Sequence, residues 1–307
     1  MLAPLVVVAG PTGSGKSELA LRLAEEFSGE IVNCDSLQIY RGFDAGTAKI
    51  APAKRRGIPH HMIDVVDAGQ VYSAGDYARD ARRSIAGISA RGRLPVVAGG
   101  TGFYLRALLH GLPHLPSRNA ALREKLAARE TARPGSLHRI LTRLDPGAAR
   151  RIHARDRQKL IRALEIRLLT RHAAPSSDFA DPLVGFRTLV LGLNPDRAGL
   201  YKILDARAQE MFRCGLIEEV QHLLHAGATG EEKPFASLGY RQALECLRGS
   251  MTLEEAIAAT QLATRQYAKR QWTWFRREPS IIWLNGFGSD AAVVERAIAL
   301  AAEFMRA

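Results

Sequence analysis

Cysteine is scarce in this chain, and long hydrophobic runs are missing. The three cysteines, Cys34, Cys214 and Cys246, lie far apart among the 307 residues. A disulfide framework needs an even set of cysteines and a zinc site needs closely spaced Cys and His residues, so neither is indicated. No apolar run approaches the roughly 20 residues of a membrane span, and the N-terminus shows no signal-peptide pattern. We therefore expect a cytoplasmic protein without a membrane partner.

Acidic residues are in the minority, and the imbalance is local. The formal net charge is +12. Residues 113–172 include fifteen Lys or Arg residues and five acidic residues, a surplus of ten positive charges. A basic surplus confined to one segment is typical of contact with a polyanion such as nucleic acid. An Arg-rich solvated surface explains the charge equally well.

The first strand and turn, residues 5–17, read LVVVAGPTGSGKS. A Val-rich run leads into the G-x-x-x-x-G-K-S spacing of a P-loop, the phosphate-binding loop of ATP-binding proteins. Apolar residues at helical spacing follow, so backbone N–H groups and a helix N-terminus would face a phosphate. This predicts a di- or triphosphate site with Lys16 as point charge and Ser17 as Mg²⁺ ligand. The loop residues are Gly10, Pro11, Thr12, Gly13, Ser14, Gly15, Lys16 and Ser17.

Two further strand ends carry polar side chains. Asp35 directly follows the apolar strand expected at 30–34, and Thr101 lies in the glycine-rich turn that follows the strand expected at 94–98. In a parallel sheet both lie at the carboxyl edge beside the P-loop, where glycines let the backbone approach a ligand. A cap of the next helix explains Asp35 on its own equally well. Gly99 takes the usual place of a Walker-B acid, which argues against ordinary ATP hydrolysis and leaves Asp64 as a substitute.

From Pro113 the pattern changes to helices. Along the last of them and its lead-in, Arg155, Lys159 and Arg162 recur at i, i+4 and i+7 and form a basic stripe suited to a phosphate backbone. A Ser- and Pro-rich linker follows at 175–182. The helices are expected at 119–129, 136–145, 146–152 and 156–171.

The rest of the chain returns to mixed character. Basic and aromatic residues alternate at 265–276, which suits base stacking, although Trp272 and Trp274 fit a core equally well. Together these patterns predict an α/β fold: a P-loop NTPase-like parallel sheet with helices on both faces, formed by residues 1–112 and 186–307, with an inserted all-helical domain at 113–185. Further strands are expected at 59–64, 187–193 and 280–285.

As a set, the motifs resemble the tRNA dimethylallyltransferase family over nearly the whole chain. Gly13, Arg155 and Leu238 depart from its usual pattern, and the zinc-finger extension of eukaryotic members is not found, so the resemblance is to the bacterial type. The motifs are GPTGSGKS at 10–17, DSLQIYR at 35–41, GTAK at 46–49, HHMID at 60–64, YSAGDY at 72–77, GGTGFY at 99–104, RQKLIRALEI at 157–166, GLIEEV at 215–220, LGYRQ at 238–242 and YAKRQWTWFR at 267–276.

The resemblance implies an enzyme that transfers a dimethylallyl group from dimethylallyl diphosphate to the exocyclic amine of the adenosine 3′-adjacent to a tRNA anticodon. Pyrophosphate leaves, Mg²⁺ is the cofactor, and the protein is expected to be a monomer. Asp35 would be the general base, Thr101 would bond the bridging diphosphate oxygen, and Arg207 would contact pyrophosphate. The positions matching tRNA contacts are Asp35, Ser36, Leu37, Gln38, Thr101, Arg123, Gln158, Lys159, Leu160, Ile161 and Arg162.

Three other activities stay open from the sequence. A small-molecule or nucleotide kinase shares the P-loop but has little use for a strongly basic insertion. A non-catalytic, nucleotide-gated RNA-binding protein explains the charge but not Asp35 and Thr101 together. An adenylate prenyltransferase would act on free AMP or ADP instead of tRNA.

Overall fold

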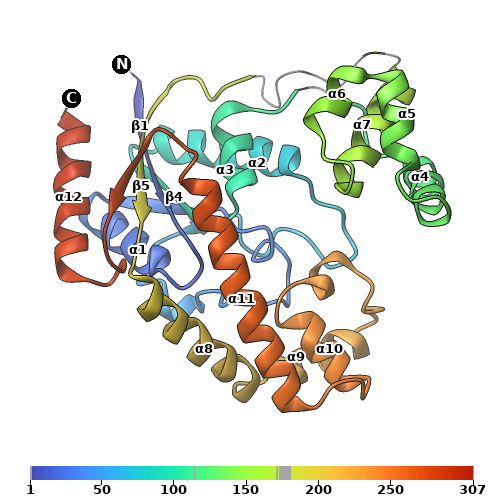
Figure 1. Ribbon diagram of the computed structural model, residues 1–307. Coiled ribbons are helices and arrows are strands. Elements are labelled where there is room, and N and C mark those ends of the chain that lie inside the picture. The colour runs from blue at the N-terminus through green and yellow to red at the C-terminus, as the bar shows by residue number, and fades with distance from the viewer. Residues whose placement is uncertain (1, 114, 171, 173–180, 307) are drawn as a thin grey trace. The chain divides into compact units, whose positions relative to one another are not determined.

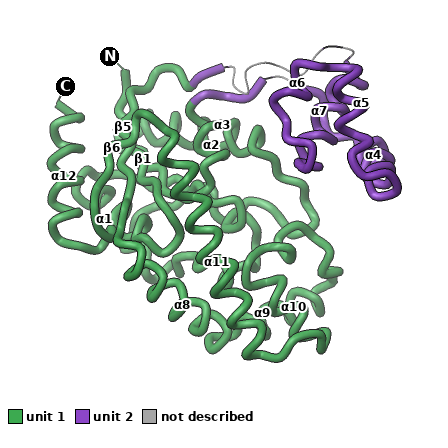
Figure 2. The backbone as a smooth tube through the Cα atoms, viewed as in Figure 1, with its two compact units in different colours: residues 1–109, 183–307 green, residues 110–182 purple. Residues whose placement is uncertain are grey.

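A computed structural model describes residues 2–113, 115–170, 172 and 181–306. The chain forms two compact units, which Figure 2 distinguishes by colour. Unit 1 comprises residues 1–109 and 183–307, and unit 2 comprises residues 110–182. The insertion expected from the sequence begins and ends three residues later, at 113 and 185. Most of the linker expected at 175–182 lies outside the described residues.

Unit 1 is built on a parallel sheet of six strands in the order β3-β2-β4-β1-β5-β6 (Figure 1). The central strands are runs of Val, Leu and Ile buried on both faces, as expected for a sheet covered by helices on each side. The strands are β1 (Ala3–Ala9), β2 (Gly29–Asn33), β3 (His60–His61), β4 (Leu94–Gly99), β5 (Phe186–Leu193) and β6 (Ile281–Leu284).

Strand β3 is much shorter than the strand expected at 59–64. Met62 and Asp64 adopt φ values of 62° and 56°, in the left-handed region, so the extended conformation ends at His61. The two histidines bond different groups, since His60 Nδ1 lies 2.8 Å from the Ile58 carbonyl oxygen and His61 Nε2 lies 2.7 Å from Glu30 Oε2. Within the described residues, no group of three His, Cys, Asp or Glu side chains could hold a metal ion.

Helices cover both faces of the sheet, because side chains of β1 alternate between two apolar clusters. Leu5, Val7 and Ala9 pack with α2 (Ala74–Ala90), α3 (Gly102–His110) and the C-terminal half of α11 (Leu253–Phe275). Val6 and Val8 pack with α1 (Lys16–Glu26) and α12 (Ala291–Arg306). The remaining helices of unit 1 are η1 (Pro52–Lys54), α8 (Arg197–Arg213), α9 (Leu216–His225), η2 (Lys233–Ala236) and α10 (Tyr240–Leu247).

Unit 2 is helical throughout its described part. Its apolar core is formed by side chains of α4, α5, α6 and α7, among them Leu126, Leu141 and Leu164. Asn119 caps α4 and Asp145 caps α6, each accepting a bond from a backbone N–H of the first turn. In the described part of both units, no helix is long and apolar enough to cross a membrane. The helices are α4 (Ala120–Ala132), α5 (Ser136–Leu144), α6 (Pro146–Arg151) and α7 (Arg157–Thr170).

Candidate active site

Three adjacent strands end at one edge of the sheet and bring the predicted residues together. The P-loop follows β1, Asp35 follows β2 by one residue and Thr101 follows β4. Strand β4 lies between the other two, pairing with both through the last residues of each strand. A Cβ on Gly99 would lie 2.1 Å from the carbonyl oxygen of Cys34. The Walker-B position therefore has no room for a side chain.

The P-loop encloses the Lys16 ammonium group. Its Nζ donates to the Pro11 carbonyl oxygen at 2.7 Å. Burial lowers the pKa of Lys16 to about 8, while the nearby Asp35 carboxylate opposes this shift and Arg207 adds to it. Ser17, in the first turn of α1, is exposed, and its hydroxyl bonds no other described residue. The loop thus presents one enclosed cation and one open hydroxyl at a helix N-terminus, an arrangement suited to an anion.

Asp35 combines the two roles that the sequence left open. Its Oδ1 accepts from the backbone N–H of Leu37 at 2.9 Å, so Asp35 caps the turn formed by residues 36–39, and not a helix as the sequence suggested. Among the described residues, nothing donates to its Oδ2. The carboxylate is therefore held in place by one oxygen while the other remains available to a substrate.

Thr101 is tied to the same turn. Its Oγ1 accepts from the backbone N–H of Ser36 at 3.1 Å, and its own N–H donates to the Cys34 carbonyl oxygen at 3.2 Å. Next in this turn is Gln38, whose Nε2 donates to the Thr47 carbonyl oxygen at 3.1 Å. The loops after β2 and β4 therefore form one hydrogen-bonded assembly that carries both Asp35 and Thr101.

Arg207 reaches this assembly from α8. Its Nη2 lies 3.5 Å from the Thr47 carbonyl oxygen, and its buried Nε has no hydrogen-bond partner in the described part of the chain. Burial lowers the pKa of Arg207, and the nearby Asp35 raises it. Two enclosed cations, Lys16 and Arg207, thus share a single carboxylate. Buried charges normally pair fully, so the surplus positive charge indicates a site for an anionic ligand.

Helix α11 contributes residues that the sequence reasoning missed. Tyr267 lies beside Thr101, and burial raises the pKa of Tyr267 to about 12. The buried Gln271, one turn later, bonds both the P-loop and the turn that carries Thr101. Trp272 is buried, and Trp274 packs against the core with Arg106 stacked on its ring, so these rings are core residues and not a base-stacking surface. Tyr267 and Gln271 are four positions apart, a spacing that places two polar side chains on one face of a helix, and this pattern could have indicated their role from the sequence.

Unit 2 corrects part of the predicted set of tRNA contacts. The side chains of Leu160 and Ile161 are buried in its core, so they support the helix instead of facing a nucleic acid. Gln158 and Lys159 are exposed on α7. Arg155 lies in the turn before α7, as expected for the lead-in, and Lys159 and Arg162 lie on the helix itself.

Arg123 and Arg162 are engaged within unit 2. Both donate to Glu165 Oε2, from Arg123 Nη1 at 3.2 Å and Arg162 Nη1 at 2.7 Å. Glu165 is fully buried, and its other oxygen accepts from the Asn119 N–H at 2.7 Å. Burial alone would raise the pKa of Glu165, but these bonds, above all from Arg162, lower it below its usual value. The two arginines thus satisfy a buried carboxylate, a structural role that the sequence did not indicate.

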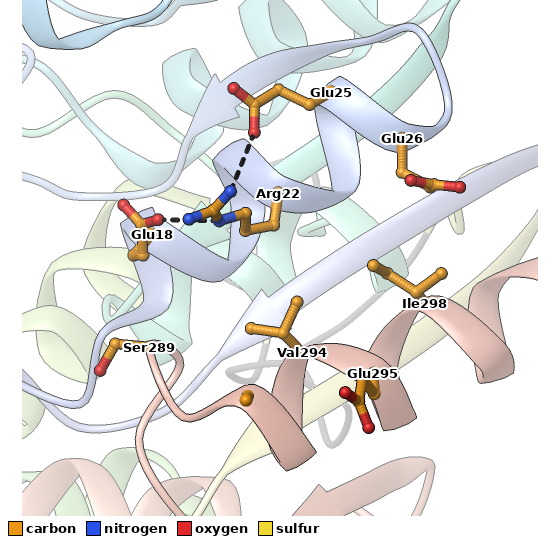
Figure 3. A pocket seen from close by; sticks show the side chains of 9 residues that line it. Glu18, Arg22, Glu25, Glu26, Ser289, Val294, Glu295 and Ile298 are labelled. Carbon is orange, nitrogen blue, oxygen red and sulfur yellow. Dashed lines mark hydrogen bonds and ion pairs between the residues drawn. The ribbon is translucent and has the colours of Figure 1, made fainter.

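A surface groove between α1 and α12 has a different character (Figure 3). It measures about 400 Å³ and has an apolar floor that includes Val294 and Ile298. Carboxylates line it, and Arg22 bridges Glu18 and Glu25 at 3.1 Å and 3.9 Å. Its acidic lining does not suit a diphosphate or a nucleic acid.

Comparisons with known proteins show the family of this chain. A family model described as IPP transferase matches residues 38–278. The tRNA dimethylallyltransferase of Solibacter usitatus is 59% identical over 305 residues, covering 98% of this chain and 99% of that protein. The solved full-length tRNA isopentenylpyrophosphate transferase from Bacillus halodurans superposes with a TM-score of 0.71 at 34% identity, covering 99% of this chain and 95% of that one.

A second solved structure is closer in shape. It is described as a eukaryotic dimethylallyltransferase acting on tRNA and superposes with a TM-score of 0.82 at 28% identity, covering 99% of this chain and 80% of that one. The chain therefore belongs to the tRNA dimethylallyltransferase family and is an enzyme that transfers a dimethylallyl group to tRNA.

Proposed function

We propose that the donor is dimethylallyl diphosphate and that the acceptor is the exocyclic amine of the adenosine 3′-adjacent to the anticodon, in the anticodon stem-loop of a tRNA. The observation that carries this proposal is the surplus of positive charge at the carboxyl edge, where Lys16 and Arg207 surround Asp35. A diphosphate leaving group supplies the missing negative charge, and an amine acceptor needs the carboxylate as a base.

Departure of pyrophosphate is assisted by the P-loop side of the site. As the carbon–oxygen bond breaks, negative charge grows on the bridging oxygen. The loop N–H groups, the N-terminus of α1 and the cations Lys16 and Arg207 are preorganised to stabilise that charge. The Thr101 hydroxyl, which accepts from the backbone N–H of Ser36, is the proposed donor to the bridging oxygen.

Asp35 activates the acceptor from the opposite side. The lone pair of the adenine amine is delocalised into the ring, so the amine is a weak nucleophile. Removing its proton as the new nitrogen–carbon bond forms contributes about 10²- to 10⁴-fold to the rate. Because Leu37 holds only Oδ1, Oδ2 of Asp35 is the atom that takes the proton. The target base leaves its stack to reach this atom.

Mg²⁺ is the proposed cofactor, and the residues present fit a weakly protein-bound ion. Ser17 offers an exposed hydroxyl at the start of α1, whereas Asp64, the substitute acid, is paired with Lys49 at 2.6 Å. Magnesium commonly keeps several waters and binds through substrate phosphates. Ser17 would then be its protein ligand. When bound, the ion neutralises phosphate charge on the leaving group.

The tRNA backbone is the proposed partner of unit 2. Many of its basic side chains are exposed, including Lys125, Arg129, Arg133, Arg143 and Arg150. Such cations contribute to affinity by releasing counterions from phosphates, without reading sequence. We further propose that the enzyme acts as a monomer.

Incubation with labelled dimethylallyl diphosphate, bulk tRNA and Mg²⁺, followed by mass spectrometry of the tRNA nucleosides, tests the proposal. We expect one prenylated adenosine next to the anticodon and one pyrophosphate per transfer. Product formation that requires ATP would contradict the leaving-group role of the P-loop and favour a kinase-like reaction. Strong competition by free AMP would instead identify an adenylate prenyltransferase.

A further inference from the structure

Gln271 of α11 joins two loops of the active site through a single side-chain amide. Its Oε1 accepts from the P-loop N–H of Thr12 at 2.8 Å, and its Nε2 donates to the Gly100 carbonyl oxygen at 2.8 Å. The side chain is 6% exposed. Both polar ends of the amide are satisfied, and the two partners belong to loops that follow different strands, β1 and β4.

We infer that Gln271 is a positioning residue for the transfer reaction, one that fixes the P-loop relative to Thr101. This inference rests on the roles proposed above for the diphosphate site and for Thr101. Gln271 is not placed against either substrate. It acts by setting the distance between the groups that bind the leaving pyrophosphate and the hydroxyl that bonds its bridging oxygen.

The packing of α11 against the glycine-rich turn shows how closely this distance is controlled. A Cβ on Gly100 would lie 2.3 Å from Gln271 Nε2, and a Cβ on Gly102 would lie 2.1 Å from Trp274 Nε1. The two glycines on either side of Thr101 therefore make room for α11.

Three side chains of α11, spaced at i, i+4 and i+7, thus contact three consecutive residues of the turn. Tyr267 lies beside Thr101, Gln271 bonds Gly100, and Trp274 packs against Gly102. Of these three, Gln271 also reaches the P-loop. A displacement of reacting groups by roughly 1 Å can lower the rate of a reaction about 10²-fold. The Gln271 side chain, which holds the P-loop and the Thr101 turn at a fixed distance, therefore affects the rate without touching the substrate.

The test compares two glutamines of the same helix. Gln271→Met keeps the length of the side chain but removes both hydrogen bonds. The matched control is Gln261→Met, which removes one bond from Gln261 Nε2 to the Asp205 carbonyl oxygen at 3.1 Å, away from the three strand ends. We expect kcat to fall about 10-fold or more in Gln271→Met, in line with loss of registration, while kcat of Gln261→Met stays within about 2-fold of wild type.

Two further readouts separate positioning from general stability. Affinity for tRNA, measured by direct binding, should not change in Gln271→Met. The Tm of each variant is also measured, and Gln271→Met should lose more kcat than Gln261→Met for the same decrease in Tm. Gln271→Asn retains both polar groups but is one methylene shorter, so it can satisfy one partner at a time. Its kcat should lie between those of wild type and Gln271→Met, and it serves as the deciding variant if Gln271→Met does not fold.

A folded Gln271→Met enzyme with wild-type kcat, or an equal loss of kcat in Gln261→Met, would overturn the positioning role. Asp35→Asn, measured in the same assay, tests the proposed function separately from the positioning role of Gln271. If Asp35→Asn is inactive while Gln271→Met is fully active, only the positioning role fails. If Asp35→Asn is fully active, the proposed chemistry itself fails.

Discussion

Two clusters of charge in this enzyme are built in opposite ways. At the carboxyl edge of the sheet in unit 1, Lys16 and Arg207 surround one carboxylate, and the Nε of Arg207 has no partner in the described part of the chain. In unit 2, the buried Glu165 accepts from two arginines and one backbone N–H. The first cluster contains polar groups that could form further hydrogen bonds, whereas in the second cluster the buried acid has all the partners it needs.

This difference distinguishes residues that are available to bind a ligand from residues that stabilise the fold. An unsatisfied buried polar group costs roughly 1–3 kcal/mol, so it persists in a native protein when a ligand compensates or a function requires it. A satisfied buried ion pair needs no such ligand. Arg123 and Arg162 were expected to bind tRNA, and their pairing with Glu165 shows that they also have a structural role.

The largest expected effect tests the carboxylate of the first cluster. Asp35→Asn keeps the shape and the ability to cap the turn at Leu37 but cannot accept a proton. We expect kcat to fall by about 10²- to 10⁴-fold while tRNA affinity changes little, because the proposed contacts with the tRNA backbone lie in unit 2. Single-turnover kinetics with saturating tRNA measure the chemical step. Near-normal turnover would remove Asp35 from the mechanism and leave it as a turn cap.

The second prediction tests whether Glu165 is structural. In Glu165→Gln the carboxylate that receives Arg123 and Arg162 becomes neutral, and loss of the charge-assisted bonds should lower the stability of unit 2 by about 2 kcal/mol. Hydrogen exchange of α4 and α7 peptides in the full-length protein measures the loss. Amides of unit 1 are the internal control and should exchange as in wild type.

Acid should remove the difference in stability between wild type and Glu165→Gln. The direction of this pH dependence follows from the pKa of Glu165. Its folded-state pKa lies below the usual value of 4.5, because the bonds from Arg162 and Asn119 outweigh burial. Its contribution is therefore complete above about pH 4.5 and disappears as the pH falls through the lowered folded-state pKa. An equal stability gap between wild type and Glu165→Gln at pH 7 and well below the folded-state pKa would show that the charge of Glu165 is not involved.

The sequence could predict the first cluster but not the second, for a physical reason. The P-loop, Asp35 and Thr101 each follow an apolar strand, and parallel strands bring their carboxyl ends to one edge whatever the rest of the chain does. Glu165 and Arg123 are 42 positions apart, and Gln271 and Thr12 are 259 apart. Periodicity shows which face of a helix is polar, but it does not show which cation on that face meets an acid from another helix.

A third prediction uses the lowered pKa of Lys16. Because Lys16 loses its proton near pH 8 in the free enzyme, kcat/KM for dimethylallyl diphosphate should fall by up to about tenfold per pH unit above that value. The sign follows from the leaving group, which is stabilised by the ammonium form only. Lys16→Arg, whose guanidinium stays charged, should have a lower rate but no such decline. A decline of equal slope in both enzymes would assign it to another group.

The smallest expected effect concerns the exposed cations of unit 2. The Lys159 side chain is 72% exposed and pairs with Asp156 at 3.2 Å. An exposed pair adds little to stability, so Lys159→Ala should leave hydrogen exchange of unit 2 unchanged. If Lys159 neutralises one tRNA phosphate, the slope of log K against log salt should shrink by roughly one unit or slightly less, with a severalfold loss of affinity at low salt.

Arg162→Ala provides the contrast on the same helix. It removes a bond to the buried Glu165 and another to the Pro116 carbonyl oxygen at 3.0 Å, so unit 2 should exchange faster. Lys159→Arg retains the charge and should keep both slope and affinity, which separates loss of charge from loss of side-chain shape. Unchanged tRNA binding by Lys159→Ala at every salt concentration would mean that this lysine lies on a solvated surface. The phosphate contacts would then have to come from other exposed cations, such as Lys125 and Arg129 on α4.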